Sequence, residues 1–262
     1  MVKGSINYFS CVISCNIRGC DQKLKVPLKA YLLVSHGSRD PRPGVAMEQL
    51  VNLLTQRVSN HGVVGAAALE LQPQPLHEKI RIFTEKARHL GCDQIQLVPI
   101  FLLPGVHVME DIPAEVAKAE SLLGEKQVIK ITPYLGSHPR LSELLQTQVS
   151  SHPSVGKILL THGSRRPQGN LPVETMAAKL GAIAAYWSVS PSLESQVTQL
   201  VASGCQEVAI ITYFLFPGGI TDAIASQQEA LKLQFPEVRF HLTAPLGASP
   251  ELADLIGDLT HT

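Results

Sequence analysis

The sequence has no net charge and no long hydrophobic run. Its 22 lysine and arginine residues are balanced by 22 aspartate and glutamate residues, so no excess of positive charge indicates a nucleic-acid partner. No apolar run approaches the roughly 18 residues that a membrane-spanning helix needs. We therefore expect a soluble, cytoplasmic protein that binds neither nucleic acid nor membrane.

Cysteine is scarce, and its count of five is odd, which argues against a closed disulfide framework. Cys92 and Cys205 each follow a glycine, and we interpret both as small buried residues beside a helix end. The other three cysteines are Cys11, Cys15 and Cys20. Three thiolates without a clear fourth ligand are weak support for a zinc or iron–sulfur site. We treat residues 1–29 as an appended segment of unknown role, open to interpretation as a disordered leader.

Two phosphate-binding motifs are also missing. No strand is followed by the GxGxxG of dinucleotide-binding folds, and no turn has the GxxxxGK[ST] spacing of a P-loop. Neither nucleotide-binding mode is therefore predicted.

One stretch organises the chain. Residues 31–35 (YLLVS) are typical of a buried strand, and His36 follows them before a turn rich in Gly, Ser and Pro. A helical pattern then begins at Met47. Because open α/β sheets bind ligands at the carboxyl edge of their strands, we expect His36 to face a cleft.

The chain contains an internal repeat. Residues 35–39 (SHGSR) match residues 161–165 (THGSR), shifted by 126 positions. The GC, PG and ITPYLG blocks at 91, 104 and 131 recur in the same order at 204, 217 and 242, the last as LTAPLG. A repeat of this length indicates two copies of one domain. We place the domains at 30–152 and 153–262, with the boundary near 151–156.

Strand and helix patterns alternate along both halves. The first half is predicted to have strands at 30–35, 63–71, 94–103 and 127–132, with helices at 44–59, from the 73–75 turn to 90, at 113–123 and at 139–149. The second half is predicted to have strands at 156–161, 207–216 and 238–244, with helices at 171–185, 192–203, 222–233 and 249–259. We therefore expect an α/β protein of two tandem domains, each a mainly parallel sheet of about four strands flanked by helices.

Three polar residues of the first half follow consecutive strands. They are His36, Glu70 at the end of the second strand and His107 in the loop after the third. Two imidazoles and a carboxylate suit a divalent transition metal with open coordination positions, and they could also transfer protons. Each could instead be an ordinary loop residue, but a carboxylate in an apolar strand is costly to bury without a partner.

The second half lacks most of this set. His162 matches His36, whereas the position of Glu70 falls near Tyr186 and Trp187, and His107 aligns with Ile220. We expect one active half and one supporting half, with His162 as a relic, a capping residue or a contributor across the interface.

Polar residues also follow His36 in the turn. Helix amino termini and arginines attract anions, so Ser38, Arg39 and Arg42 could bind acidic side groups of a substrate. Helix capping and solvation explain the same residues equally well.

Taken together, three motifs resemble those of the sirohydrochlorin chelatases, the class II tetrapyrrole chelatases. They are residues 36–41 (HGSRDP), residues 68–71 (ALEL), and residues 98–107 (VPIFLLPGVH) followed by DIP at 111–113. The likeness covers about residues 30–260 and implies the long form with two chelatase-like domains. No carboxyl-terminal histidine-rich or iron–sulfur tail is present in this sequence to match those of some long members.

The resemblance implies insertion of Co2+ or Fe2+ into sirohydrochlorin, for cobalamin or siroheme synthesis. It implies that His36 and His107 hold the metal with Glu70 beside them, and that no organic cofactor or ATP takes part. The alternative is a metal or tetrapyrrole carrier that uses the same site. A histidine phosphohydrolase is disfavoured because Ser35 and Thr161, not arginine, precede the two His-Gly pairs. Fusion of two copies predicts a monomer with pseudo-dimeric domains.

Overall fold

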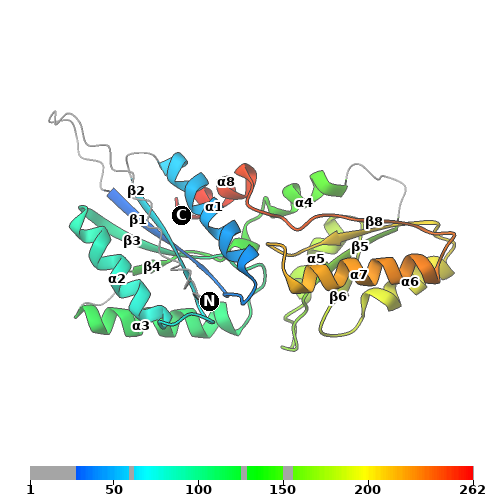
Figure 1. Ribbon diagram of the computed structural model, residues 1–262, viewed down its shortest axis with the longest axis horizontal. Helices are drawn as coiled ribbons and strands as arrows, with labels where there is room; N and C mark the ends of the chain where they lie inside the picture. The colour runs from blue at the N-terminus through cyan, green and yellow to red at the C-terminus, as the bar shows by residue number, and fades with distance from the viewer. Residues whose placement is uncertain (1–27, 59–61, 125–128, 150–155, 262) are drawn as a thin grey trace, which may run out of the picture.

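The computed structural model describes residues 28–58, 62–124, 129–149 and 156–261, and it consists of two lobes lying side by side (Figure 1). Each lobe contains one four-stranded parallel sheet flanked by helices, so the predicted α/β fold of two similar units is confirmed. Three cysteines of the amino-terminal segment, Cys11, Cys15 and Cys20, lie outside the described residues. Most of the predicted boundary at 151–156 lies outside them as well.

The first half of the chain forms one sheet and the helices that follow its strands. Its elements are β1 (Leu28–Ser35), α1 (Pro41–Val58), β2 (Gly62–Ala68), α2 (Leu76–His89), β3 (Cys92–Pro99), the π-helical turn η2 (His107–Asp111), α3 (Ile112–Leu123), β4 (Ile129–Ile131), the 3-10 turn η3 (Leu135–Ser137) and α4 (Leu141–Val149). The strand order is β2-β1-β3-β4. Strand β1 therefore lies between β2 and β3, and the residues that follow these three strands meet at one edge of the sheet.

The second half repeats this plan. Its elements are β5 (Gly156–Thr161), α5 (Leu171–Lys179), β6 (Ile183–Tyr186), α6 (Leu193–Ala202), β7 (Glu207–Thr212), α7 (Gly219–Gln234), β8 (Arg239–Leu242) and α8 (Pro250–Leu259). The strand order β6-β5-β7-β8 corresponds to that of the first sheet.

The prediction of one helix over 171–185 is wrong. Helix α5 ends at Lys179, Gly181 adopts a φ of +63°, and residues 183–186 form strand β6 on the edge of the sheet. Alanine-rich sequence favours a helix locally, but here pairing with β5 outweighs that preference. The strands predicted to reach 103 and 216 are shorter as well, and end at Pro99 and Thr212.

The two halves exchange their last helices. Helix α4 belongs to the first half but packs against β7 of the second sheet, and α8 belongs to the second half but packs against α1 of the first lobe (Figure 1). Leu145 of α4 and Ile256 of α8 are fully buried in one apolar cluster that also includes Leu33 of β1 and Leu159 of β5. A single hydrophobic core therefore connects both lobes.

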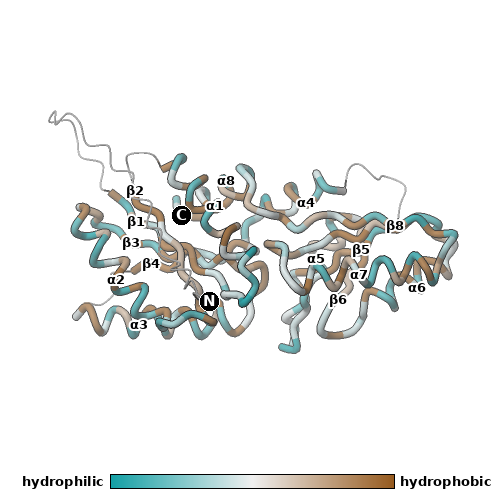
Figure 2. Tube along the Cα trace, viewed as in Figure 1, coloured by the Kyte–Doolittle hydropathy of each residue, from teal (hydrophilic) through white to brown (hydrophobic). Residues whose placement is uncertain are grey.

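The outer faces of the two sheets have separate cores. Helices α2 and α3 cover one face of the first sheet, and α6 and α7 cover one face of the second. The strands carry mostly hydrophobic residues, whereas the helices alternate between hydrophobic and polar residues (Figure 2). This pattern is typical of sheets that are buried on both faces. Within the described residues, no helix has the length and apolar character to cross a membrane.

Candidate functional site

The three residues predicted to bind a metal come together. One ligand atom from each of His36, Glu70 and His107 can be chosen so that all three atoms lie within 4.8 Å of one another. The His36 and His107 ring centroids are 4.7 Å apart with an edge-to-face geometry, and His36 Nε2 lies 3.9 Å from Glu70 Oε2. The cluster therefore combines two imidazoles and one carboxylate, the donor set that first-row divalent metals accept.

A backbone hydrogen bond connects the segments that follow β1 and β2, which carry His36 and Glu70. The Glu70 amide donates a hydrogen bond to the His36 carbonyl at 2.9 Å, which continues the pairing of β1 with β2. Gly37 follows with a φ of +102°, and a Cβ atom there would lie 2.2 Å from the Glu70 carbonyl oxygen. Only glycine fits this position, because any side chain would push the His36 and Glu70 backbones apart.

His107 lies in the π-helical turn η2, where a loop was predicted. The wide turn places His107 beside Asp111, and the two side chains are 2.7 Å apart between Nδ1 and Oδ2. A carboxylate oxygen accepts, so Nδ1–H donates and Nε2 keeps the lone pair that a metal needs. The His36 Nδ1 lies 3.2 Å from the Gly37 carbonyl oxygen. If Nδ1–H donates to this oxygen, the Nε2 of His36 also keeps its lone pair for a metal.

Sequence reasoning did not assign a role to Asp111. Its carboxylate orients His107, and carboxylates commonly orient the histidines of metal sites in this way. The sequence signal for this role is the spacing: Asp111 follows His107 by four residues. A helical turn places residues at this spacing on the same face of the helix.

The cluster borders a cavity of about 850 Å³ that both lobes line. This volume lies within the usual range for ligand pockets. His36, Ser38 and His107 line the cavity from the first lobe, and His162 and Phe216 line it from the second. About half of the His36 and Glu70 side chains and a third of the His107 side chain are exposed, and the two histidines face the cavity.

Lys79 is the one lysine or arginine among the described residues that line the cavity. Its side chain is buried in α2, and its Nζ donates to Gln72 Oε1 at 2.9 Å. Burial lowers the pKa of Lys79 from its usual value, because desolvation disfavours the charged form. Sequence reasoning did not predict a role for this residue in the cavity.

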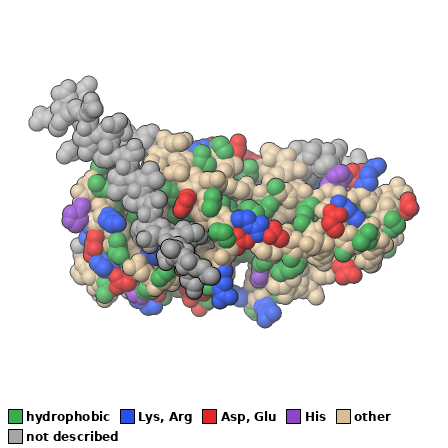
Figure 3. Space-filling view, viewed as in Figure 1, with side chains coloured by type: hydrophobic (Ala, Val, Ile, Leu, Met, Phe, Trp, Pro, Cys, Tyr) green, Lys and Arg blue, Asp and Glu red, His purple; other side chains and the backbone are tan. Residues whose placement is uncertain are grey.

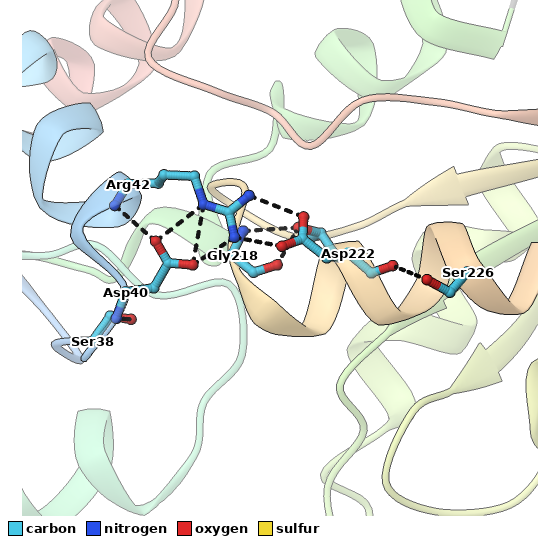
Figure 4. A network of polar contacts seen from close by, with 7 residues as sticks. Ser38, Asp40, Arg42, Gly218, Asp222 and Ser226 are labelled. Carbon is cyan, nitrogen blue, oxygen red and sulfur yellow. Dashed lines mark hydrogen bonds and ion pairs between the residues drawn. The ribbon is translucent and has the colours of Figure 1, made fainter.

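The structure separates the three residues predicted to bind acidic groups. Ser38 lines the cavity, and its Oγ accepts a hydrogen bond from the Asp40 amide. Arg39 is exposed and does not line the cavity. The Arg42 guanidinium lies between Asp40 and Asp222, so in this structure it does not extend free into the cleft (Figure 4).

The second half retains the backbone of the site without its ligands. The Ser188 amide donates to the His162 carbonyl at 2.9 Å, as the Glu70 amide does to His36, so Ser188 is the true counterpart of Glu70. This corrects the sequence alignment, which placed that position near Tyr186 and Trp187. Within the described residues, no metal-type cluster forms around His162.

One further histidine and the two described cysteines lie away from the cluster. His138 is buried before α4, and its Nδ1 accepts a hydrogen bond from the Arg140 amide, as a residue that shapes the start of a helix would. Cys92 is buried at the start of β3, and Cys205 is partly buried.

Comparison with known proteins agrees with this geometry. The chain is 24% identical over 250 residues to a sirohydrochlorin ferrochelatase of Priestia megaterium, a match that covers 90% of each chain. It is 23% identical over 245 residues to a sirohydrochlorin cobaltochelatase of the same organism, covering 87% of this chain and 78% of that one.

Among solved structures, SirB from Bacillus subtilis with Fe3+ has the same fold. The TM-score is 0.74 at 20% identity, and the match covers 89% of this chain and 94% of SirB. The resemblance predicted from the sequence motifs is confirmed. Because the CbiX family model matches residues 30–152 and 156–261, this chain belongs to the CbiX family.

Proposed function

We propose that this protein is a sirohydrochlorin chelatase that inserts Co2+ or Fe2+ into sirohydrochlorin. The observation that carries the proposal is the cluster of His36, Glu70 and His107, whose two histidines line the cavity between the lobes. The names of the relatives, cobaltochelatase and ferrochelatase, agree with it. The metal is a substrate in this reaction, and we propose that no organic cofactor takes part.

The cluster suits a metal that must be released. A closed structural site encloses its ion with four ligands, whereas this cluster offers three and leaves one side open to the cavity. The open side allows the nitrogens of the macrocycle to replace protein ligands one at a time. The His107–Asp111 hydrogen bond keeps the imidazole oriented during this exchange.

Insertion also requires a base. Two pyrrole N–H protons leave the macrocycle when the metal enters, and a neutral imidazole or an ionised carboxylate can accept them. His36, Glu70 and His107 are the groups placed to do so. In addition, we propose that Ser38 on the cavity wall and Arg42 beside it contribute to binding the acidic side groups of the ring, and that the chain acts as a monomer.

The experiment that tests this function measures metal insertion by absorption spectroscopy, with purified protein, sirohydrochlorin and Co2+, Fe2+ or Ni2+ in parallel. We expect His36→Ala and His107→Ala to abolish insertion, because each removes a metal ligand, and His162→Ala to have a milder effect. Near-normal turnover by both of the first two variants would refute the assignment.

The alternative function, a carrier of metal or tetrapyrrole, is distinguished by the same assay. A carrier binds the metal and the ring without accelerating insertion above the rate in buffer. Comparison of the three metals gives the preference, because affinity alone follows the general order of first-row ions and geometry sets the selectivity.

A further inference from the structure

Two ion pairs connect the lobes beside the cavity. Arg42, near the start of α1, donates from Nη1 to Asp222 Oδ1 of α7 at 2.9 Å. Arg166, which follows β5, lies 3.1 Å from Glu110 Oε1 of η2. Each pair joins the segment after the first strand of one lobe to the segment after the third strand of the other lobe. The space-filling view shows a notch between the lobes with basic side chains on both sides (Figure 3).

Each arginine is adjacent to the cavity wall. Asp40, Pro43 and Gly44 flank Arg42 and line the cavity, and Ser164 and Gly169 do so on either side of Arg166. The arginines and their acidic partners are each between 43% and 60% exposed. Ion pairs this exposed contribute little net stability, so another carboxylate can replace either acid at small cost.

The environment of Arg42 carries excess negative charge. Its guanidinium is shared between Asp40 and Asp222, two carboxylates for one cation (Figure 4). Hydrogen bonds from Arg42 lower the pKa values of both carboxyl groups, so both are ionised at neutral pH. The Nε of Arg42 donates to both carboxylate oxygens of Asp40, two residues before it. Asp40 would therefore keep the guanidinium in place if the ion pair with Asp222 were broken.

We propose that Asp222 and Glu110 compete with the carboxylates of the macrocycle for Arg42 and Arg166. In the free protein they occupy Arg42 and Arg166, and in the complex the ring's carboxylates take their places. This inference rests on the proposed function for the identity of the ring. It explains why Lys79 is the one lysine or arginine on the described cavity wall although the proposed substrate is acidic: Arg42 and Arg166 lie beside the wall, already paired.

The experiment compares both members of each pair. Binding of metal-free sirohydrochlorin, and of uroporphyrin as a second polycarboxylate ring, is followed by fluorescence at low ionic strength. We expect Asp222→Asn and Glu110→Gln to lower Kd, and Arg42→Gln and Arg166→Gln to raise it, each by about three- to tenfold. In the Arg42→Gln background, Asp222→Asn should have no further effect.

A different result is expected if the two ion pairs only hold the lobes together. Substitution of either member of a pair would then change Kd in the same direction, or would leave it unchanged. Either outcome would overturn the proposal. Arg57→Gln and Asp254→Asn are matched controls, because this pair joins α1 to α8 and neither residue lines the cavity. A change in these controls as large as that of Asp222→Asn would also overturn it.

The binding measurement does not depend on metal insertion. A wild-type protein that binds the ring without inserting metal would defeat the proposed function and leave the competition measurable. Unaltered Co2+ binding by the four variants would show that the group of His36, Glu70 and His107, which lies within the first lobe, is intact.

Discussion

At the scale of single residues, the candidate site depends on how two imidazole rings are held. His36 and His107 each bind an oxygen acceptor close by in the sequence through Nδ1, so each presents Nε2 to the cavity. Asp111 supplies a charged acceptor to His107, whereas His36 has only a backbone carbonyl. The two imidazole rings therefore differ in how firmly they are oriented. Mutation of Asp111 tests this difference, because it removes the charged acceptor.

We expect Asp111→Ala to weaken Co2+ binding by about 10- to 100-fold, because His107 would lose the acceptor that fixes its ring. Asp111→Asn keeps an acceptor oxygen without the charge and should have a smaller effect. Calorimetric titration with Co2+ measures both. Asp93→Ala, an exposed residue at the other end of β3, is the control, and equal affinities of Asp111→Ala and wild type would contradict the role.

At the scale of elements, α2 and α3 pack on the same face of the first sheet and are joined by a partly buried carboxylate. Glu115 Oε2 accepts a hydrogen bond from the His77 amide at 2.9 Å and lies 2.7 Å from His77 Nδ1, while Oε1 lies 2.6 Å from Lys118 Nζ. Burial raises the pKa of Glu115, but the hydrogen bonds from Lys118 and His77 outweigh it, and the net pKa is lowered. Glu115 thus stabilises the fold in its ionised form.

Glu115→Gln should lower the free energy of unfolding by about 1 to 2 kcal/mol at pH 7. A lowered folded-state pKa gives stability that is present above the unfolded pKa and is lost as the pH falls through the folded value. The difference from wild type should therefore shrink below about pH 4. Denaturant unfolding across this pH range measures it, with the exposed Glu237→Gln as control. A difference that does not vary with pH would rule out this explanation.

At the scale of the whole molecule, the exchange of α4 and α8 makes the two lobes one packing unit. The apolar cluster shared by both sheets includes the interior faces of α1, α4, α5 and α8. Ion pairs from α8 to the first half add to it, from Asp254 to Arg57 and from Asp258 to Arg140. We therefore expect the lobes to unfold together, not as two independent domains.

Ile256→Ala tests this cooperativity, because Ile256 is fully buried on α8 against the first lobe. Such a truncation costs about 2 to 5 kcal/mol. The single tryptophan, Trp187, lies in the second lobe and reports on it by fluorescence. We expect Trp187 fluorescence and far-UV circular dichroism to show the same fall in Tm. An unchanged Trp187 transition would show that the lobes unfold separately.

The sequence alone determined the α/β class, the duplication and the grouping of His36, Glu70 and His107. These follow from short-range patterns: a strand that ends in His36, and the fact that carboxyl ends of neighbouring parallel strands meet at one edge. Because β1 lies between β2 and β3, His36 falls between Glu70 and His107. Periodicity and repeat spacing carry this information without knowledge of the packing.

Only the tertiary structure decided the rest. The exchange of α4 and α8, strand β6, and the pairing of Arg42 with Asp222 depend on contacts between residues distant in sequence, for which local pattern gives no signal. Asp111 became visible only when a π-helical turn placed it beside His107. Local chemistry thus specified which residues could bind a metal, and packing between the lobes set the shape of the cavity around them.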